Sequence, residues 1–111
     1  MPLVTFKASG ADNCVRADGL PYVYVRTEAG GSVLPASCPH RGGPLNLATP
    51  DAAGRRLVCP WHERGSSLAR LRRQVPAVRS GDTVTAVLPG PADADVELCH
   101  LPLSPALAAG A

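Results

Sequence analysis

The chain contains Cys38-Pro39-His40-Arg41-Gly42-Gly43-Pro44-Leu45 and, further on, Cys59-Pro60-Trp61-His62. These two stretches indicate a metal site, because a C-x-H pattern is followed, after 18 intervening residues, by a C-x-x-H pattern. Thiolate sulfur and imidazole nitrogen bind zinc or an iron–sulfur centre. The single residue between Cys38 and His40 does not fit the usual zinc-finger spacing of about two to four residues. We therefore interpret Cys38, His40, Cys59 and His62 as ligands of one metal centre, with iron–sulfur chemistry favoured.

The segments around these stretches predict short β-strands. β-Branched and aromatic residues in 22–27 are typical of a strand, and a Gly30-Gly31 hairpin turn would join it to a partner over 32–36. Only 67–73 has the propensity for a helix. The sequence therefore predicts an all-β protein, whose remaining strands lie at 3–7 (an edge strand), 57–58, 83–88 and 95–99.

Length and composition indicate one domain. The 111 residues suffice for a single modest core, and 12 prolines with 11 glycines favour turns over long helices. We expect a domain over 1–100 and, because Pro102 and Pro105 interrupt the end of the chain, a flexible tail over 101–111.

The N-terminus shows no signal peptide, and no run reaches the ~18–20 apolar residues of a membrane helix. The expected location is the cytoplasm, where cysteines are ligands or free thiols more often than disulfides. We accordingly expect Cys14 and Cys99 to be free, partly buried thiols. His100 is interpreted as a surface residue.

The charge is unevenly distributed along the chain. The net charge is +2, yet residues 55–79 carry seven arginines against Glu63 alone. Such a run is either solvated surface or a docking face for an acidic partner. It lacks the interleaved aromatic residues and the recognition motif of a nucleic-acid-binding segment, so nucleic acid is not an expected partner.

The pattern C-P-H-R-G-x-P-L followed by C-P-W-H resembles the signature of Rieske ferredoxins and of Rieske domains in ring-hydroxylating oxygenases. The resemblance implies a fold of antiparallel β-sheets with a [2Fe–2S] cluster, one per chain, at the tip of a small lobe. It further implies that Cys38 and Cys59 hold one iron and that His40 and His62 hold the other. Neutral imidazoles remove negative charge from that iron, so Rieske potentials lie at about −150 to +300 mV instead of about −400 mV.

The sequence departs from the family pattern in three places. Gly43 and Trp61 occupy the positions of the cysteines that form a disulfide in respiratory-chain members, so that brace is absent. Arg64 and Ser66 occupy the positions at which members with a high reduction potential have a Ser and a Tyr that donate hydrogen bonds to cluster sulfur. Their replacement favours a low-to-middle reduction potential, with one hydroxyl donor still available. Glu63 replaces the glycine that usually follows the second histidine.

The resemblance implies a small electron carrier and no enzyme. It would take single electrons from a flavin-dependent reductase, pass them to a terminal oxygenase and act as a monomer. An oxygenase catalytic subunit is excluded, because only His100 remains for a second iron site. Two alternatives stay open: an electron donor to a non-Rieske oxygenase such as a di-iron enzyme, and a module in which the metal stabilises an interaction or sensing surface.

Overall fold

The computed structural model describes residues 1–27, 30–37, 44–52, 55–60 and 65–109. All strand pairings among these residues are antiparallel, which confirms the predicted all-β class. In chain order the elements are β1 (Leu3–Lys7), β2 (Cys14–Ala17), β3 (Leu20–Thr27), β4 (Gly30–Pro35), the 3-10 helix η1 (Leu45–Leu47), β5 (Thr49–Pro50), β6 (Arg56–Val58), β7 (Gly65–Ser67), α1 (Leu68–Gln74), β8 (Ala77–Ser80), β9 (Thr83–Val87), β10 (Val96–Cys99) and α2 (Pro105–Ala109).

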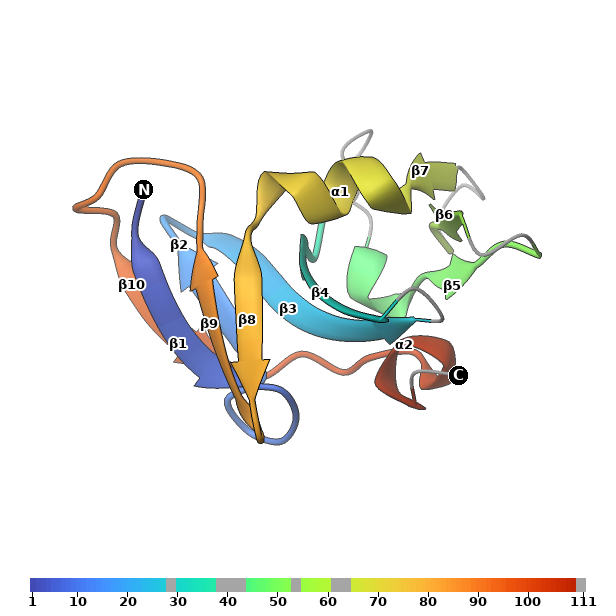
Figure 1. Ribbon diagram of the computed structural model, residues 1–111, viewed down its shortest axis with the longest axis horizontal. Coiled ribbons are helices and arrows are strands. Elements are labelled where there is room, and N and C mark those ends of the chain that lie inside the picture. Colours follow the sequence, from blue (N-terminus) through green and yellow to red (C-terminus); the bar gives the residue numbers. More distant parts are fainter. Residues whose placement is uncertain (28–29, 38–43, 53–54, 61–64, 110–111) are drawn as a thin grey trace.

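The described strands form three sheets, with the orders β1-β9-β8, β10-β2-β3-β4 and β5-β6-β7. Figure 1 shows the first sheet at one end of the molecule and the small third sheet at the other, with α1 leading from β7 to β8. The predicted strand over 3–7 is confirmed as β1, which lies at the edge of the first sheet.

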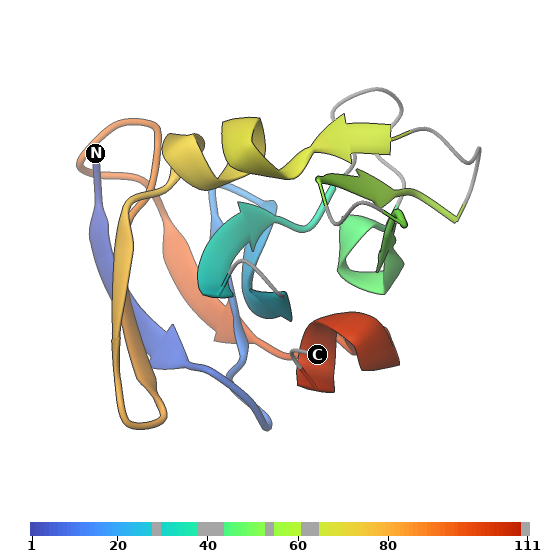
Figure 2. The ribbon, with the colours of Figure 1, turned by 45° about the vertical axis from the view of Figure 1, so that its right-hand side comes forward.

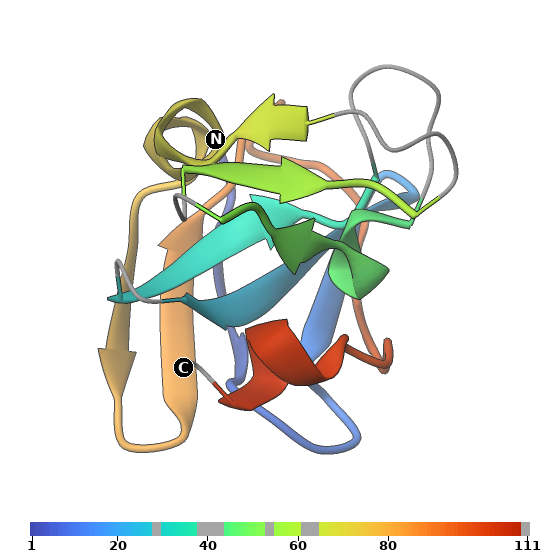
Figure 3. The ribbon, with the colours of Figure 1, turned by 90° about the vertical axis from the view of Figure 1, so that its right-hand side faces the viewer.

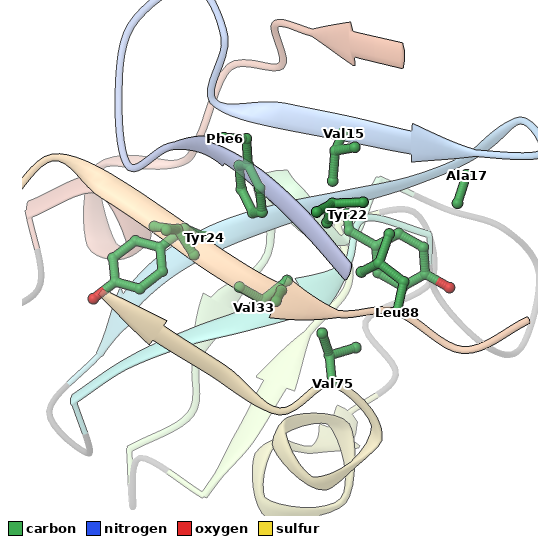
Figure 4. Close-up of a cluster of buried hydrophobic side chains, with 11 residues drawn as sticks. Phe6, Val15, Ala17, Tyr22, Tyr24, Val33, Val75 and Leu88 are labelled. Atoms are coloured by element: carbon green, nitrogen blue, oxygen red, sulfur yellow. The ribbon is translucent and has the colours of Figure 1, made fainter. Parts of the chain in front are cut away.

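Strand β3 lies between two hydrophobic clusters. Tyr22 and Tyr24 belong to the first cluster, between the first two sheets, where Figure 4 shows them with Phe6 and Leu88. Val23 and Val25 belong to the second cluster, on the opposite face of the strand. Successive side chains of a strand point to opposite faces. A strand that is buried on both faces therefore has a continuous run of apolar residues in its sequence instead of an alternating pattern.

The turns of the second sheet explain one incorrect prediction. Asp18 and Gly19, both with positive φ, form the two-residue turn between β2 and β3, as a hairpin with right-handed twist requires. Gly30 and Gly31 do not form the next turn; they belong to β4, opposite Thr27 and Arg26. Gly31 is needed for a different reason, because a Cβ there would overlap the hydroxyl of Tyr24.

Helix α1 confirms the predicted helix, shifted by one residue. The Ser67 hydroxyl accepts the backbone N–H of Arg70 at 3.3 Å, which satisfies one unpaired donor of the first turn. Leu68 and Leu71, three residues apart on the helix, are both 3% exposed and pack in the second cluster. The remaining face of the helix carries arginines.

The predicted flexible tail from residue 101 is wrong for the part that the structure describes. Residues 101–109 pack against the sheet, and Leu107 is fully buried in the second cluster. The Ser104 hydroxyl donates to the Ala48 carbonyl oxygen at 2.6 Å. Figure 3 shows α2 lying against β3. The packed unit thus continues beyond residue 100, at least as far as Leu107.

Candidate metal centre

The residues on either side of the first motif pair with each other through the backbone, and we call this pairing the first junction. Strand β4 leads through Ala36 to Ser37, which forms an isolated antiparallel bridge with Pro44. The Leu45 N–H donates to the Ala36 carbonyl oxygen at 2.8 Å, so the chain returns directly beside the strand it left. The six residues 38–43 follow Ser37 and precede Pro44. Cys38 and His40 lie among them and therefore outside the described residues.

The second motif starts from a similar junction. Val58 of β6 pairs with Gly65 of β7, and residues 59–64 lie between them. Cys59 follows β6 directly and is fully buried as a free thiol. His62 lies outside the described residues. Of the four predicted ligands, the structure thus describes Cys59.

The two junctions share one core. The second cluster contains Ala36 and Leu45 from the first junction together with Leu57 from the second, all 3% exposed or less. Leu68 of α1 packs in the same cluster, and its N–H donates to the Arg55 carbonyl oxygen at 2.9 Å. Figure 2 shows β6, β7 and η1 together at this end of the molecule. Both motifs are therefore anchored on one rigid support, as a site with several ligands requires.

Ser66 is the unusual polar residue at the second junction. It lies opposite Leu57 in the β6–β7 pair and is 6% exposed. Its Oγ atom is buried without a hydrogen-bond partner in the described part of the chain. A buried hydroxyl without a partner costs free energy, so this donor favours a nearby acceptor.

Two exposed arginines of the run, Arg56 and Arg70, lie beside this junction. A groove of about 370 Å³ lies between β7 and α1, and Arg56 and Arg70 line it together with Ser66. The Arg56 side chain also passes Gly65, and its Nη1 lies 3.5 Å from the Gly65 carbonyl oxygen. The described exposed arginines of the run form no salt bridge with a described residue; they are Arg55, Arg56, Arg70, Arg73 and Arg79.

His100 and Cys99 have the predicted exposure, whereas Cys14 is buried more completely than predicted. His100 is exposed, and its Nδ1 lies 2.8 Å from the Gly10 carbonyl oxygen. Cys14 is a fully buried free thiol, and Cys99 is a half-buried one. What the sequence did not reveal is that Arg56 and Arg70 share a groove, since their proximity depends on the β6–β7 register and on the rotation of α1.

An antiparallel β fold with Cys and His motifs at two strand-paired junctions is the architecture expected of a small metalloprotein. The chain belongs to the Rieske [2Fe–2S] domain family, whose model matches residues 5–86. No curated protein and no solved structure matches it. Within the described residues, no helix is long and apolar enough to cross a membrane.

Rieske domains bind a [2Fe–2S] cluster and serve as electron-transfer modules. The residues present fit this group. The motifs supply two thiols and two imidazoles, the donor set of a Rieske centre. Cys59 is shielded from water at the end of its strand. On the neighbouring strand, the buried Ser66 hydroxyl has no hydrogen-bond partner among the described residues.

Proposed function

We propose that this chain is a Rieske-type ferredoxin, a one-electron carrier between a flavin-dependent reductase and a terminal oxygenase. Cys38 and Cys59 would hold one iron through thiolates, and His40 and His62 would hold the other through imidazoles. The protein would act in the cytoplasm as a monomer. The observation that carries the proposal is the fully buried Cys59 at a junction that shares its core with the first motif.

The cluster supplies reversible one-electron oxidation and reduction when it is bound. The protein's own residues shape that chemistry. Burial of Cys59 excludes water from its sulfur, and the strand pairing of Val58 with Gly65 holds the backbone that precedes Cys59. Ser66 would donate its hydroxyl hydrogen bond to a cluster sulfur, and the reduction potential would rise because such a bond stabilises negative charge on the sulfur.

The groove beside the second junction supports an acidic redox partner. Arg56 and Arg70 are exposed on its two sides, with no described carboxylate to neutralise them. Charged surfaces accelerate encounter and orient the partner without requiring high affinity, which suits brief electron-transfer contacts.

The metal content and spectra of matched variants test the cluster assignment. The purified protein should contain two irons and two sulfides per chain and should give a Rieske-type EPR signal after dithionite reduction. Cys59→Ser should lose this signal, whereas Cys99→Ser should keep it. A colourless wild-type protein containing zinc would contradict the proposal and would favour the interaction-module alternative.

Reconstituted turnover tests the carrier role. The protein should support NADH-dependent oxygenation when it is combined with a flavin reductase and a Rieske oxygenase, and Cys59→Ser should not. Turnover with a di-iron oxygenase alone would keep the carrier role and change the terminal partner. Failure to transfer electrons to any oxygenase, with an intact cluster, would contradict it.

A further inference from the structure

We propose that Cys14 and Cys99 form a second thiol site, at which a peroxide closes a reversible disulfide between β2 and β10. These two cysteines lie outside both metal motifs. The proposal therefore does not depend on how the cluster is bound.

The strand register places the two cysteines directly opposite each other. β10 pairs with β2 antiparallel, and Cys99 is the register partner of Cys14. Opposed residues of such a pair have Cα atoms about 4.5 or 5.5 Å apart, and their side chains lie on the same face of the sheet. Both separations fall within the roughly 4.4–6.8 Å that a disulfide spans. The bridge can therefore form without a change in the backbone.

The surroundings bring the two sulfurs together. Cys14 is buried in the second hydrophobic cluster, and Cys99 packs against the same cluster. Burial raises the pKa of the Cys14 thiol to about 12, and a side-chain hydrogen bond with Cys99 adds to the effect. Cys14 therefore keeps its proton. Cys99 is the more exposed sulfur, so an oxidant reaches it first.

The proposed chemistry uses one equivalent of peroxide. The Cys99 sulfur attacks hydrogen peroxide, an S–O bond forms as the O–O bond breaks, and one water leaves. The Cys14 sulfur then attacks the resulting sulfenic acid. The S–S bond forms as the S–O bond breaks, and the departing hydroxide takes the Cys14 proton as the second water. Two electrons pass from the sulfurs to the peroxide oxygens, and a dithiol reductant reverses the change.

The bridge would secure an exposed edge of the second sheet. β10 is the outermost strand of that sheet, and three of its four residues are exposed. It also leads into residues 101–109, which pack on the second cluster. A covalent link between Cys14 and Cys99 closes residues 14–99 into one long loop, which disfavours the unfolded state. We expect a higher urea midpoint for the oxidised protein.

Tryptic mapping of the full-length, cluster-containing protein tests the site. Cleavage after lysine and arginine separates the four cysteines into peptides 8–16, 27–41, 57–64 and 80–111. After treatment with hydrogen peroxide and alkylation, peptide 8–16 should be linked to peptide 80–111. Dithiothreitol should release both, and iodoacetamide should then label both cysteines. The thiol oxidant diamide, used in parallel, should give the same link without peroxide chemistry at the cluster.

Two variants keep the test decisive. Cys14→Ser and Cys99→Ser should each abolish the link and the oxidant-dependent rise of the urea midpoint. Oxidation of Cys99 to the sulfinic acid with no linked peptide under either oxidant would overturn the proposal. A dominant link that involves peptide 27–41 or peptide 57–64 would overturn it as well.

Discussion

The side chain of Asn13 and the backbone of Leu101 exchange two hydrogen bonds. Asn13 Nδ2 donates to the Leu101 carbonyl oxygen at 2.8 Å, and the Leu101 N–H donates to Asn13 Oδ1 at 3.0 Å. The carboxamide therefore acts as an additional peptide group beyond the end of the β2–β10 pair. Farther along, Asn46 Nδ2 donates to the Pro102 carbonyl oxygen at 2.7 Å. Two asparagines thus secure the chain after β10.

Replacement of Asn13 should loosen this attachment. Asn13→Ala removes both hydrogen bonds and leaves a partly buried N–H and carbonyl group without their partners. We expect the free energy of unfolding to fall by about 1–3 kcal/mol, measured by urea denaturation. Asp12→Ala, a truncation of the exposed neighbour, should change it by about 0.5 kcal/mol or less. Equal effects of the two substitutions would contradict the role assigned to Asn13.

Leu107 should contribute to stability as a core residue. It is fully buried, so Leu107→Ala should leave a cavity in the second cluster and cost about 2–5 kcal/mol of unfolding free energy. The matched substitution Leu98→Ala removes the same atoms from a side chain that is 50% exposed, and it should cost far less. If both variants unfold at the same urea concentration, α2 is not packed in solution.

The Cys14 thiol should make stability depend on pH in the alkaline range. Burial and Cys99 raise its pKa from 9.0 to about 12, so the folded protein binds more protons than the unfolded chain between these values. The unfolding free energy should therefore fall as the pH rises from 9 to 12. Cys14→Ala should flatten this dependence. Tyr22, whose pKa is also raised by burial, contributes equally to both proteins and cancels in the comparison.

The two groove arginines should accelerate electron transfer at low ionic strength. Arg56→Ser combined with Arg70→Ser should slow electron transfer to the acidic partner by roughly two- to tenfold, with an unchanged visible spectrum. At about 1 M salt, where the Debye length is about 3 Å, the difference should disappear.

The control for this experiment removes two charges elsewhere. Arg16→Ser combined with Arg79→Ser gives the same net charge, but Arg16 lies on β2 and Arg79 on β8. This variant should transfer electrons at nearly the wild-type rate. If both double variants lose rate equally, overall charge and not the groove governs the encounter.

The sequence predicted those elements whose side chains carry a clear periodic or propensity signal. Strands β3 and β9 are rich in β-branched residues, and α1 has a seven-residue run without glycine or proline. Strand β8 was not predicted. All four of its residues are exposed, so its sequence lacks the alternation of buried apolar and exposed polar residues that indicates a strand. The Cys and His motifs were evident because their spacing is specific.

The C-terminal segment was predicted to be a flexible tail because its prolines were interpreted as interrupting regular secondary structure. Pro105 is the first residue of α2, where a missing N–H costs nothing and a fixed φ favours the helix. The hydrogen bonds of Asn13 and Asn46 join residues 88 and 56 positions apart, a distance at which no local pattern reveals pairing. The groove likewise depends on tertiary packing and not on local sequence.

The packing of residues 101–109 has a practical consequence for attaching the protein to dyes, tags or electrodes. This segment forms hydrogen bonds with Asn46 and Ala48, one and three residues after the end of the first motif. Strain from a bulky group fused behind Leu107 would therefore be transmitted to the support of the metal centre. Met1 is 67% exposed and precedes β1, at the end of the molecule away from the third sheet (Figure 1). An attachment at Met1 would leave the end of the molecule that carries the third sheet unobstructed.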